Sequence, residues 1–181
     1  FTLNNNPRGT GKGVAKVQNG KCTVLSLSLG DEGSNRGTGP TIIGTDLNDI
    51  EIRDNALYIL QWNTHHSILK VDLATGNRTM VSSADKGTGH DLQGNSMAFM
   101  PDGKIWTYAA YANGFSGFVI ADPSTGNRTV SEPQGRGPVS RTQAADYGLW
   151  THPDGKHLIA QYGKQLVIYD PTNGNSNVLS Y

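Results

Sequence analysis

The sequence predicts an all-β fold, a β-propeller of about three and a half four-stranded antiparallel blades. A nine-residue segment, Val71–Thr79 (VDLATGNRT), returns as Ala121–Thr129 and more loosely as Tyr169–Asn177, after a weaker copy at Val17–Thr23. The spacings between successive copies are 56, 50 and 48 residues, taken between the marker glycines Gly20, Gly76, Gly126 and Gly174. Repeats of this length are typical of propeller blades.

A second repeated element predicts a tight hairpin turn in each blade. Met100–Lys104 (MPDGK) matches His152–Lys156 (HPDGK), and Arg53–Ala56 (RDNA) occupies the corresponding place in the preceding repeat. Proline fixes φ early in such a turn, and glycine or asparagine accepts the positive φ that follows. The Asp-x-x-Thr-Gly-Asn segments are explained in the same way, so their aspartates are interpreted as turn-forming residues.

Short β-branched and aromatic runs lie between these turns and predict four strands per repeat, ordered from the channel outward. The expected strands of the first complete blade (45–83) are 50–53, 57–62, 67–72 and 78–82. Those of the next blade (95–132) are 97–100, 105–108, 118–122 and 128–131. Those of the last blade (146–181) are 149–152, 157–161, 166–170 and 177–180. Residues 1–29 predict a partial blade with strands at 1–3, 13–17 and 21–26, and with no inner strand.

The predicted blades are too few for most closed rings, because propellers have about four to eight blades. We therefore expect residues 1–181 to be a single segment of a six- to eight-bladed ring. The missing strands would come from the same chain or from a second copy, or the segment would close as an unusual four-bladed ring. Unpaired sheet edges would otherwise promote aggregation.

The composition excludes several classes of function. Lys+Arg and Asp+Glu both number 15, so the formal net charge is zero, and neither nucleic acid nor an acidic membrane is an expected partner. No apolar run is long enough to predict a membrane span. Cys22 is the single cysteine and lies in an alternating apolar run, which predicts a buried strand thiol.

Glycine-rich loops ahead of the inner strands complete the repeat: Gly37–Pro40 (GTGP), Gly87–His90 (GTGH) and Gly135–Pro138 (GRGP). Together with VDLATGNRT and PDGKIW, they resemble the repeats of bacterial NHL-like and SMP-30/gluconolactonase-like propellers. Proteins of the SMP-30 type bind a divalent metal at the channel mouth through acidic and amide side chains. The resemblance therefore implies a possible site for Ca²⁺ or another divalent cation near the starts of the inner strands, with candidate oxygen ligands Asp46, Asn48, Asp49, Asn95 and Asp146.

Two sets of turns are short and alike in the repeats, whereas the loops on the other face of the blades vary in length and composition. This variable loop face is the predicted binding surface. Its candidate binding residues are Trp62, His65, His66, His90, Tyr111, Phe115 and Tyr147. The alternative interpretation is that aromatic side chains near these loops, Trp62 and Tyr108, simply pack between neighbouring blades. Adjacent histidines on a strand point in opposite directions, so His65 and His66 would chelate a metal only if the loop bends.

Two functional hypotheses follow. The first is a non-enzymatic, exported bacterial module with no cofactor that binds a protein or carbohydrate partner, or forms an assembly, through the variable loop face. Its Asn-, Gly-, Ser- and Thr-rich turns suit a periplasmic, cell-surface or secreted location. The alternative is a lactonase-like hydrolase, in which Asp46, Asp49 or Asp146 hold a cation that polarises a carbonyl.

Overall fold

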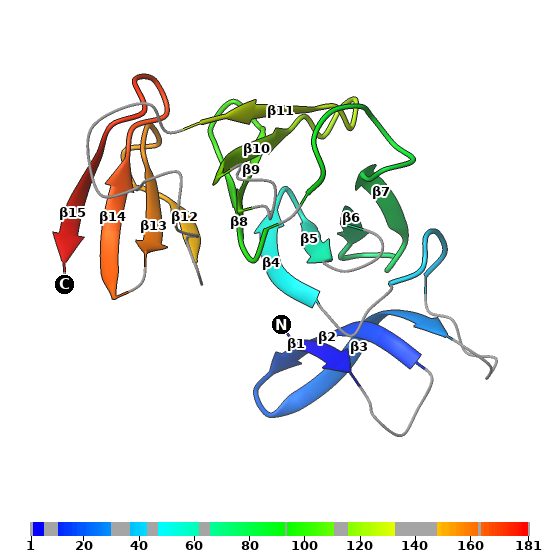
Figure 1. Cartoon of the computed structure of the whole chain (residues 1–181). Coiled ribbons are helices and arrows are strands. Elements are labelled where there is room, and N and C mark those ends of the chain that lie inside the picture. Colours follow the sequence, from blue (N-terminus) through cyan, green and yellow to red (C-terminus); the bar gives the residue numbers. More distant parts are fainter. Residues whose placement is uncertain are drawn as a thin grey trace. The chain divides into compact units, whose positions relative to one another are not determined.

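The computed structural model describes residues 2–5, 11–29, 37–42, 47–61, 66–92, 94–110, 116–132, 148–162 and 164–180. All the regular elements in these ranges are β-strands, arranged in one three-stranded and three four-stranded antiparallel sheets (Figure 1). The chain divides into two compact units, Phe1–Val81 and Ser82–Tyr181. None of the described segments is a helix long and apolar enough to cross a membrane.

The first unit contains the partial blade and the first complete blade. The partial blade has the order β1-β2-β3, with β1 (Thr2–Asn5), β2 (Gly11–Gln18) and β3 (Lys21–Leu29). The complete blade has the order β4-β5-β6-β7, with β4 (Leu47–Arg53), β5 (Ala56–Gln61), β6 (Ser67–Asp72) and β7 (Arg78–Ser82). Its core contains the buried side chains of Val14, Ile42, Leu57, Ile59, Leu69 and Val71. These apolar contacts join the two sheets.

The second unit contains two complete blades. One has the order β8-β9-β10-β11, with β8 (Met97–Phe99), β9 (Ile105–Ala110), β10 (Ser116–Ala121) and β11 (Arg128–Ser131). The other has the order β12-β13-β14-β15, with β12 (Leu149–Thr151), β13 (Leu158–Tyr162), β14 (Gln165–Tyr169) and β15 (Ser176–Ser180).

An aromatic cluster holds these two blades together. The fully buried Phe118 ring lies 4.5 Å from Tyr169, 5.2 Å from Tyr108 and 5.5 Å from Trp106, measured between ring centroids. Tyr108 is therefore a core residue, in agreement with the alternative interpretation of this side chain. Rings at these separations stabilise a fold beyond the area that they bury.

The prediction that Cys22 is buried is wrong. Cys22 is exposed and pairs with Val17, itself 54% exposed, near the turn that joins β2 and β3. Alternation along a strand identifies two faces but does not decide which face is covered. Among residues 21–27 of β3, the buried side chain is that of Ser26.

The Asp-x-x-Thr-Gly-Asn segments form the predicted turns. Oδ1 of Asp72 accepts hydrogen bonds from the backbone N–H groups of Ala74 (2.9 Å) and Thr75 (2.7 Å), and Gly76 follows with a φ of 76°. Asp122 accepts the equivalent backbone bond from Ser124 at 2.8 Å. Hydrogen bonds from Thr75 hold the pKa of Asp72 below its usual value, and bonds from Ser124 do the same for Asp122.

An arginine in the same repeat connects successive sheets. Arg78 is buried, and it donates from Nη1 to Oγ of Ser26 (2.7 Å) and from Nε to the carbonyl of Pro40 (2.7 Å). Arg128 makes the same two bonds to Ser82 (2.8 Å) and His90 (2.5 Å). We call each of these arrangements an arginine latch.

The Gly-Thr-Gly loops complete each latch. Thr38 donates its backbone N–H to Oδ1 of Asn77 (2.9 Å), and its carbonyl accepts from the N–H of Arg78 (2.7 Å). Thr88 makes equivalent bonds to Asn127 (2.9 Å) and Arg128 (2.7 Å). The two repeated motifs, Gly-Thr-Gly and Gly-Asn-Arg, therefore form a single structural unit in each blade.

Candidate functional site

Most of the sequence-predicted site residues lie outside the residues that the structure describes. They are Asp46, Trp62, His65, Tyr111, Phe115, Asp146 and Tyr147. Their roles in binding a partner or a cation therefore stay predictions.

The other five predicted residues, His66, His90, Asn48, Asp49 and Asn95, lie in different local settings. Asn48 and Asp49 are neighbours in β4, and Asn95 is exposed ahead of β8. His66 precedes β6 and is half-buried. The His90 side chain is exposed, and its backbone carbonyl belongs to the arginine latch of Arg128. Oδ1 of Asp49 accepts the backbone N–H of Ile50 at 2.8 Å. The pKa of Glu51 is raised, mainly by burial and further by the charge of Asp49.

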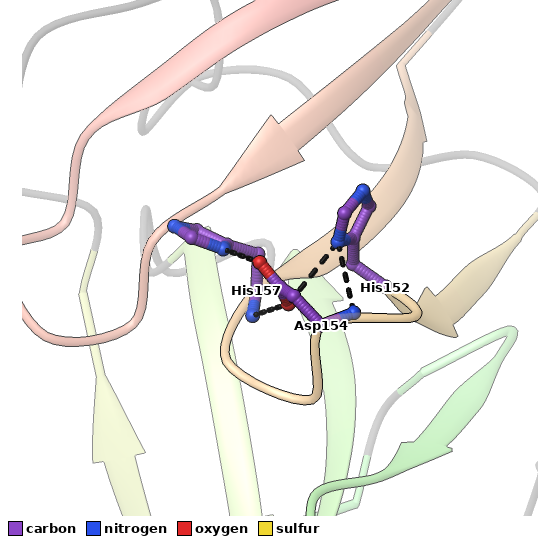
Figure 2. A group of neighbouring side chains, drawn as sticks. All are labelled: His152, Asp154 and His157. Atoms are coloured by element: carbon purple, nitrogen blue, oxygen red, sulfur yellow. Dashed lines mark hydrogen bonds and ion pairs between the residues drawn. The ribbon is translucent and has the colours of Figure 1, made fainter.

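A group of three side chains that the sequence analysis assigned to a simple turn is brought together between β12 and β13. His152, Asp154 and His157 place possible ligand atoms within 4.8 Å of one another. Figure 2 shows the Asp154 carboxylate between the two imidazole rings. Nδ1 of His152 lies 3.1 Å from Oδ1 of Asp154, and Nδ1 of His157 lies 2.5 Å from Oδ2. We call this group the histidine turn.

Backbone hydrogen bonds fix the carboxylate in this position. Oδ1 of Asp154 accepts the N–H groups of Lys156 (2.8 Å) and His157 (3.1 Å). The Lys156 bond makes the largest contribution to holding the pKa of Asp154 far below its usual value, and the His157 side chain lowers it further. Asp154 is therefore an ionised carboxylate at neutral pH, held by its own turn.

The histidine turn is partly open to solvent. The side chains of His152, Asp154 and His157 are 32%, 35% and 31% exposed. A shallow cleft of about 320 Å³ borders the same turn and is lined by Met100, Pro101, Trp106, Gly155, Lys156 and Pro171, among others. Small ligands and ions can therefore reach this end of the second unit.

Comparison with known proteins identifies the fold. A puromycin hydrolase aligns over 96% of this chain with 17% identity and a TM-score of 0.53. A puromycin-hydrolyzing peptidase of Mycobacterium tuberculosis aligns over 97% with 18% identity and a TM-score of 0.54. The extracellular domain of a hybrid two-component system from B. thetaiotaomicron aligns over 98% with 15% identity and a TM-score of 0.53.

The structural neighbours are β-propeller-type proteins. This chain has a β-propeller fold. It spans 25%, 26% and 22% of the three solved structures, respectively. No protein-family model matches the sequence, and the comparison with curated proteins finds no match. The predicted propeller repeats are confirmed, whereas the finer resemblance to NHL or SMP-30 proteins is not specifically supported.

A comparison between the repeats could have revealed the histidine turn. The N–H of Met100 bonds to the carbonyl of Lys104 across its turn, and the N–H of His152 bonds to the carbonyl of His157. The last blade therefore has one additional residue in this turn and a histidine at each of its two ends. The sequence analysis compared the shared Pro-Asp-Gly-Lys residues and overlooked the positions that flank the turn.

Proposed function

We propose that this chain is a non-enzymatic part of an extracytoplasmic bacterial propeller that binds a protein partner. The proposal that the chain is part of a larger propeller rests on one observation, an uncovered apolar face on β12–β15. Trp150, Leu166 and Leu179 are 46%, 38% and 50% exposed. Their positions in the strand registers place them on the same sheet face as Ile159 and Ile168.

The packing of the preceding blade supports another blade as the occupant of this face. Trp150 is paired with Ile159, and Ala98 is paired with Trp106 at the equivalent register of the preceding blade. Ala98 and Trp106 are buried against the opposite face of β12–β15. The exposed face of β12–β15 has the same strand register and apolar character as the buried face of the preceding blade. It is therefore suited to pack against another four-stranded blade. We assign this blade to the same polypeptide, because the solved propellers extend well beyond the aligned region.

Protein recognition is assigned to the loops at the other end of the blades. The repeated residues form turns and arginine latches, so they build the frame of each blade. The loops between β5 and β6 and between β9 and β10 do not share these motifs. Loops that vary on a fixed frame are common binding elements. The extracellular location of one structural neighbour supports an extracytoplasmic setting for this chain.

Selection of peptides on the purified chain tests this function. Random phage-displayed peptides would be selected and their affinities measured by fluorescence polarisation. Replacing residues 62–65 and 111–115 with Gly and Ser should weaken binding at least about tenfold, equivalent to 1.4 kcal/mol. A variant with Trp150→Lys and Leu179→Lys should retain binding.

A glycan array would be probed in parallel with the same proteins. Saturable glycan binding without peptide binding would contradict a protein partner. Peptide binding that survives the loop replacement would contradict the assigned face.

The lactonase-like alternative stays a prediction from the sequence resemblance. Two of its three candidate acidic ligands, Asp46 and Asp146, lie outside the described residues. Calcium titration of the chain with a thermal-unfolding readout tests it. Absence of both calcium binding and a calcium-dependent rise in Tm would exclude the calcium form of this hypothesis.

A further inference from the structure

We propose that His152, Asp154 and His157 form a binding site for a divalent transition-metal ion, with Zn²⁺ as the preferred probe. This inference is independent of the proposed protein recognition. Two imidazoles and a carboxylate are ligands that zinc accepts, and a water molecule would supply the fourth ligand in an open tetrahedral site. The Pro-Asp-Gly-Lys motif that the two turns share does not by itself predict a metal site.

The geometry of His152 gives the first argument. Its Nδ1 lies 3.3 Å from the backbone nitrogen of Asp154, so the imidazole edge faces the turn and not bulk solvent. The same Nδ1 lies 3.1 Å from the acceptor Oδ1 of Asp154. A nitrogen and a carboxylate oxygen at this distance can bind the same metal ion once the nitrogen is unprotonated. Adjacent ligands of tetrahedral zinc lie about 3.3 Å apart, given metal–ligand distances of about 2.0 to 2.1 Å.

The second histidine needs only a small adjustment. Nδ1 of His157 lies 2.5 Å from Oδ2 of Asp154, which is a hydrogen-bond distance. Metal binding would replace this bond and separate the two atoms by somewhat under about 1 Å. Both histidine side chains are about one-third exposed, so the rings have room for this change. The backbone N–H groups of Lys156 and His157 would continue to orient the carboxylate.

The preceding blade provides an internal contrast. Its turn has Met100 and Lys104 at the two ends, and Nζ of Lys104 lies 3.6 Å from Oδ2 of Asp102. The lysine ammonium supplies the positive charge beside that carboxylate. The last blade retains the lysine as Lys156, and its Asp154 carboxylate lies between the Nδ1 atoms of His152 and His157. The two histidines, which stand where the preceding repeat has Met100 and Ile105, make this carboxylate one of three possible metal ligands.

Calorimetric titration of the untagged full chain with ZnCl₂ tests the proposal. The expected result is one saturable zinc site and a zinc-dependent rise in Tm. The variant His152→Met, His157→Ile carries the residues that the preceding repeat has at both positions (MPDGKI) and should bind zinc at least about tenfold more weakly. Asp154→Asn should also weaken binding, because the amide retains an acceptor oxygen but loses the carboxylate charge.

His90→Gln is the matched control and should retain zinc affinity. Calcium should not compete, because calcium prefers oxygen ligands. Urea unfolding without metal would establish that each variant is folded. Absence of saturable zinc binding would overturn the proposal. Unchanged affinity in the folded His152→Met, His157→Ile variant would also overturn it and would locate zinc elsewhere.

Discussion

Nη1 of Arg128 donates a 2.8 Å hydrogen bond to Oγ of Ser82, a residue 46 positions earlier in the chain. The Ser82 hydroxyl in turn donates to the carbonyl of Gly126 at 2.6 Å. Arg78 and Ser26 have the same relationship in the first unit, with Gly76 accepting from Ser26. The repeat therefore encodes both a turn and its connection to the preceding sheet.

Replacing Arg128 with Met should lower the free energy of unfolding by about 3 kcal/mol, because several buried acceptors lose their donor. Arg128→Lys should recover only part of this loss, since lysine lacks the planar guanidinium. Urea unfolding followed by tryptophan fluorescence measures both effects. Arg53→Met is the control, because its pair with the exposed Asp54 should contribute less than about 1 kcal/mol. Equal losses for the two arginines would contradict the latch.

Gly89→Ala should disrupt the same latch through its backbone. Gly89 has a φ of 112°, and an added Cβ would lie 1.9 Å from the carbonyl oxygen of Arg128. We expect a loss of more than about 3 kcal/mol or failure to fold. Gly103→Ala is the comparison variant. Gly103 also has a positive φ, but no neighbouring atom lies within 4 Å of its added Cβ. Its cost should be about 1 to 2 kcal/mol in urea unfolding.

Acid should destabilise the blades through the aspartates of the repeated turns. The folded-state pKa values of Asp72 and Asp122 are lowered by hydrogen bonds, principally those from Thr75 and Ser124. A lowered carboxyl pKa contributes stability above the unfolded pKa of about 3.9, and this contribution is lost as pH falls through the folded pKa.

The double variant Asp72→Asn, Asp122→Asn should therefore show a smaller loss of stability between about pH 5 and pH 2. The amide oxygens can still accept the turn hydrogen bonds, but they do not titrate in this range. Urea midpoints measured at several pH values test the difference. Parallel pH profiles for the original chain and the variant would contradict the assigned contribution of these carboxylates.

The uncovered face of β12–β15 should tolerate charge in the isolated chain. Trp150→Lys should change the free energy of unfolding by no more than about 0.5 kcal/mol and should reduce self-association in sedimentation velocity. Val167→Lys places the charge on the fully buried opposite face, where the loss should exceed about 3 kcal/mol. Strong destabilisation by Trp150→Lys would show that its face is already part of an interior.

The sequence predicted the blade strands well because the turn residues recur at a fixed spacing. Gly76, Gly126 and Gly174 all have positive φ, as their turns require. Strand ends were less well defined: β4 begins at Leu47, before the predicted 50–53 strand. Hydrogen bonding to β5 extends the strand through a local register shift, which composition does not reveal.

Contacts between distant residues were harder to predict. Arg78 was noted as part of a repeated turn, but its bond to Ser26 depends on how two sheets pack. The histidine turn was similarly interpreted from its shared Pro-Asp-Gly residues. Its distinctive ligands, His152 and His157, occupy the ends of the turn, where the preceding repeat has other residues. Comparison of the turn geometry in the two blades reveals the two flanking histidines, which the shared turn motif does not.

The most direct test of the central claim, that these sheets belong to a larger propeller, is the mass of the protein isolated from its natural source. Denaturing and native mass spectrometry would be performed on the same material. We predict a covalent mass well above the 19.4 kDa of this sequence, because our proposal assigns further blades to the same polypeptide. A covalent mass of 19.4 kDa together with a monomer of that mass in the native spectrum would contradict the account.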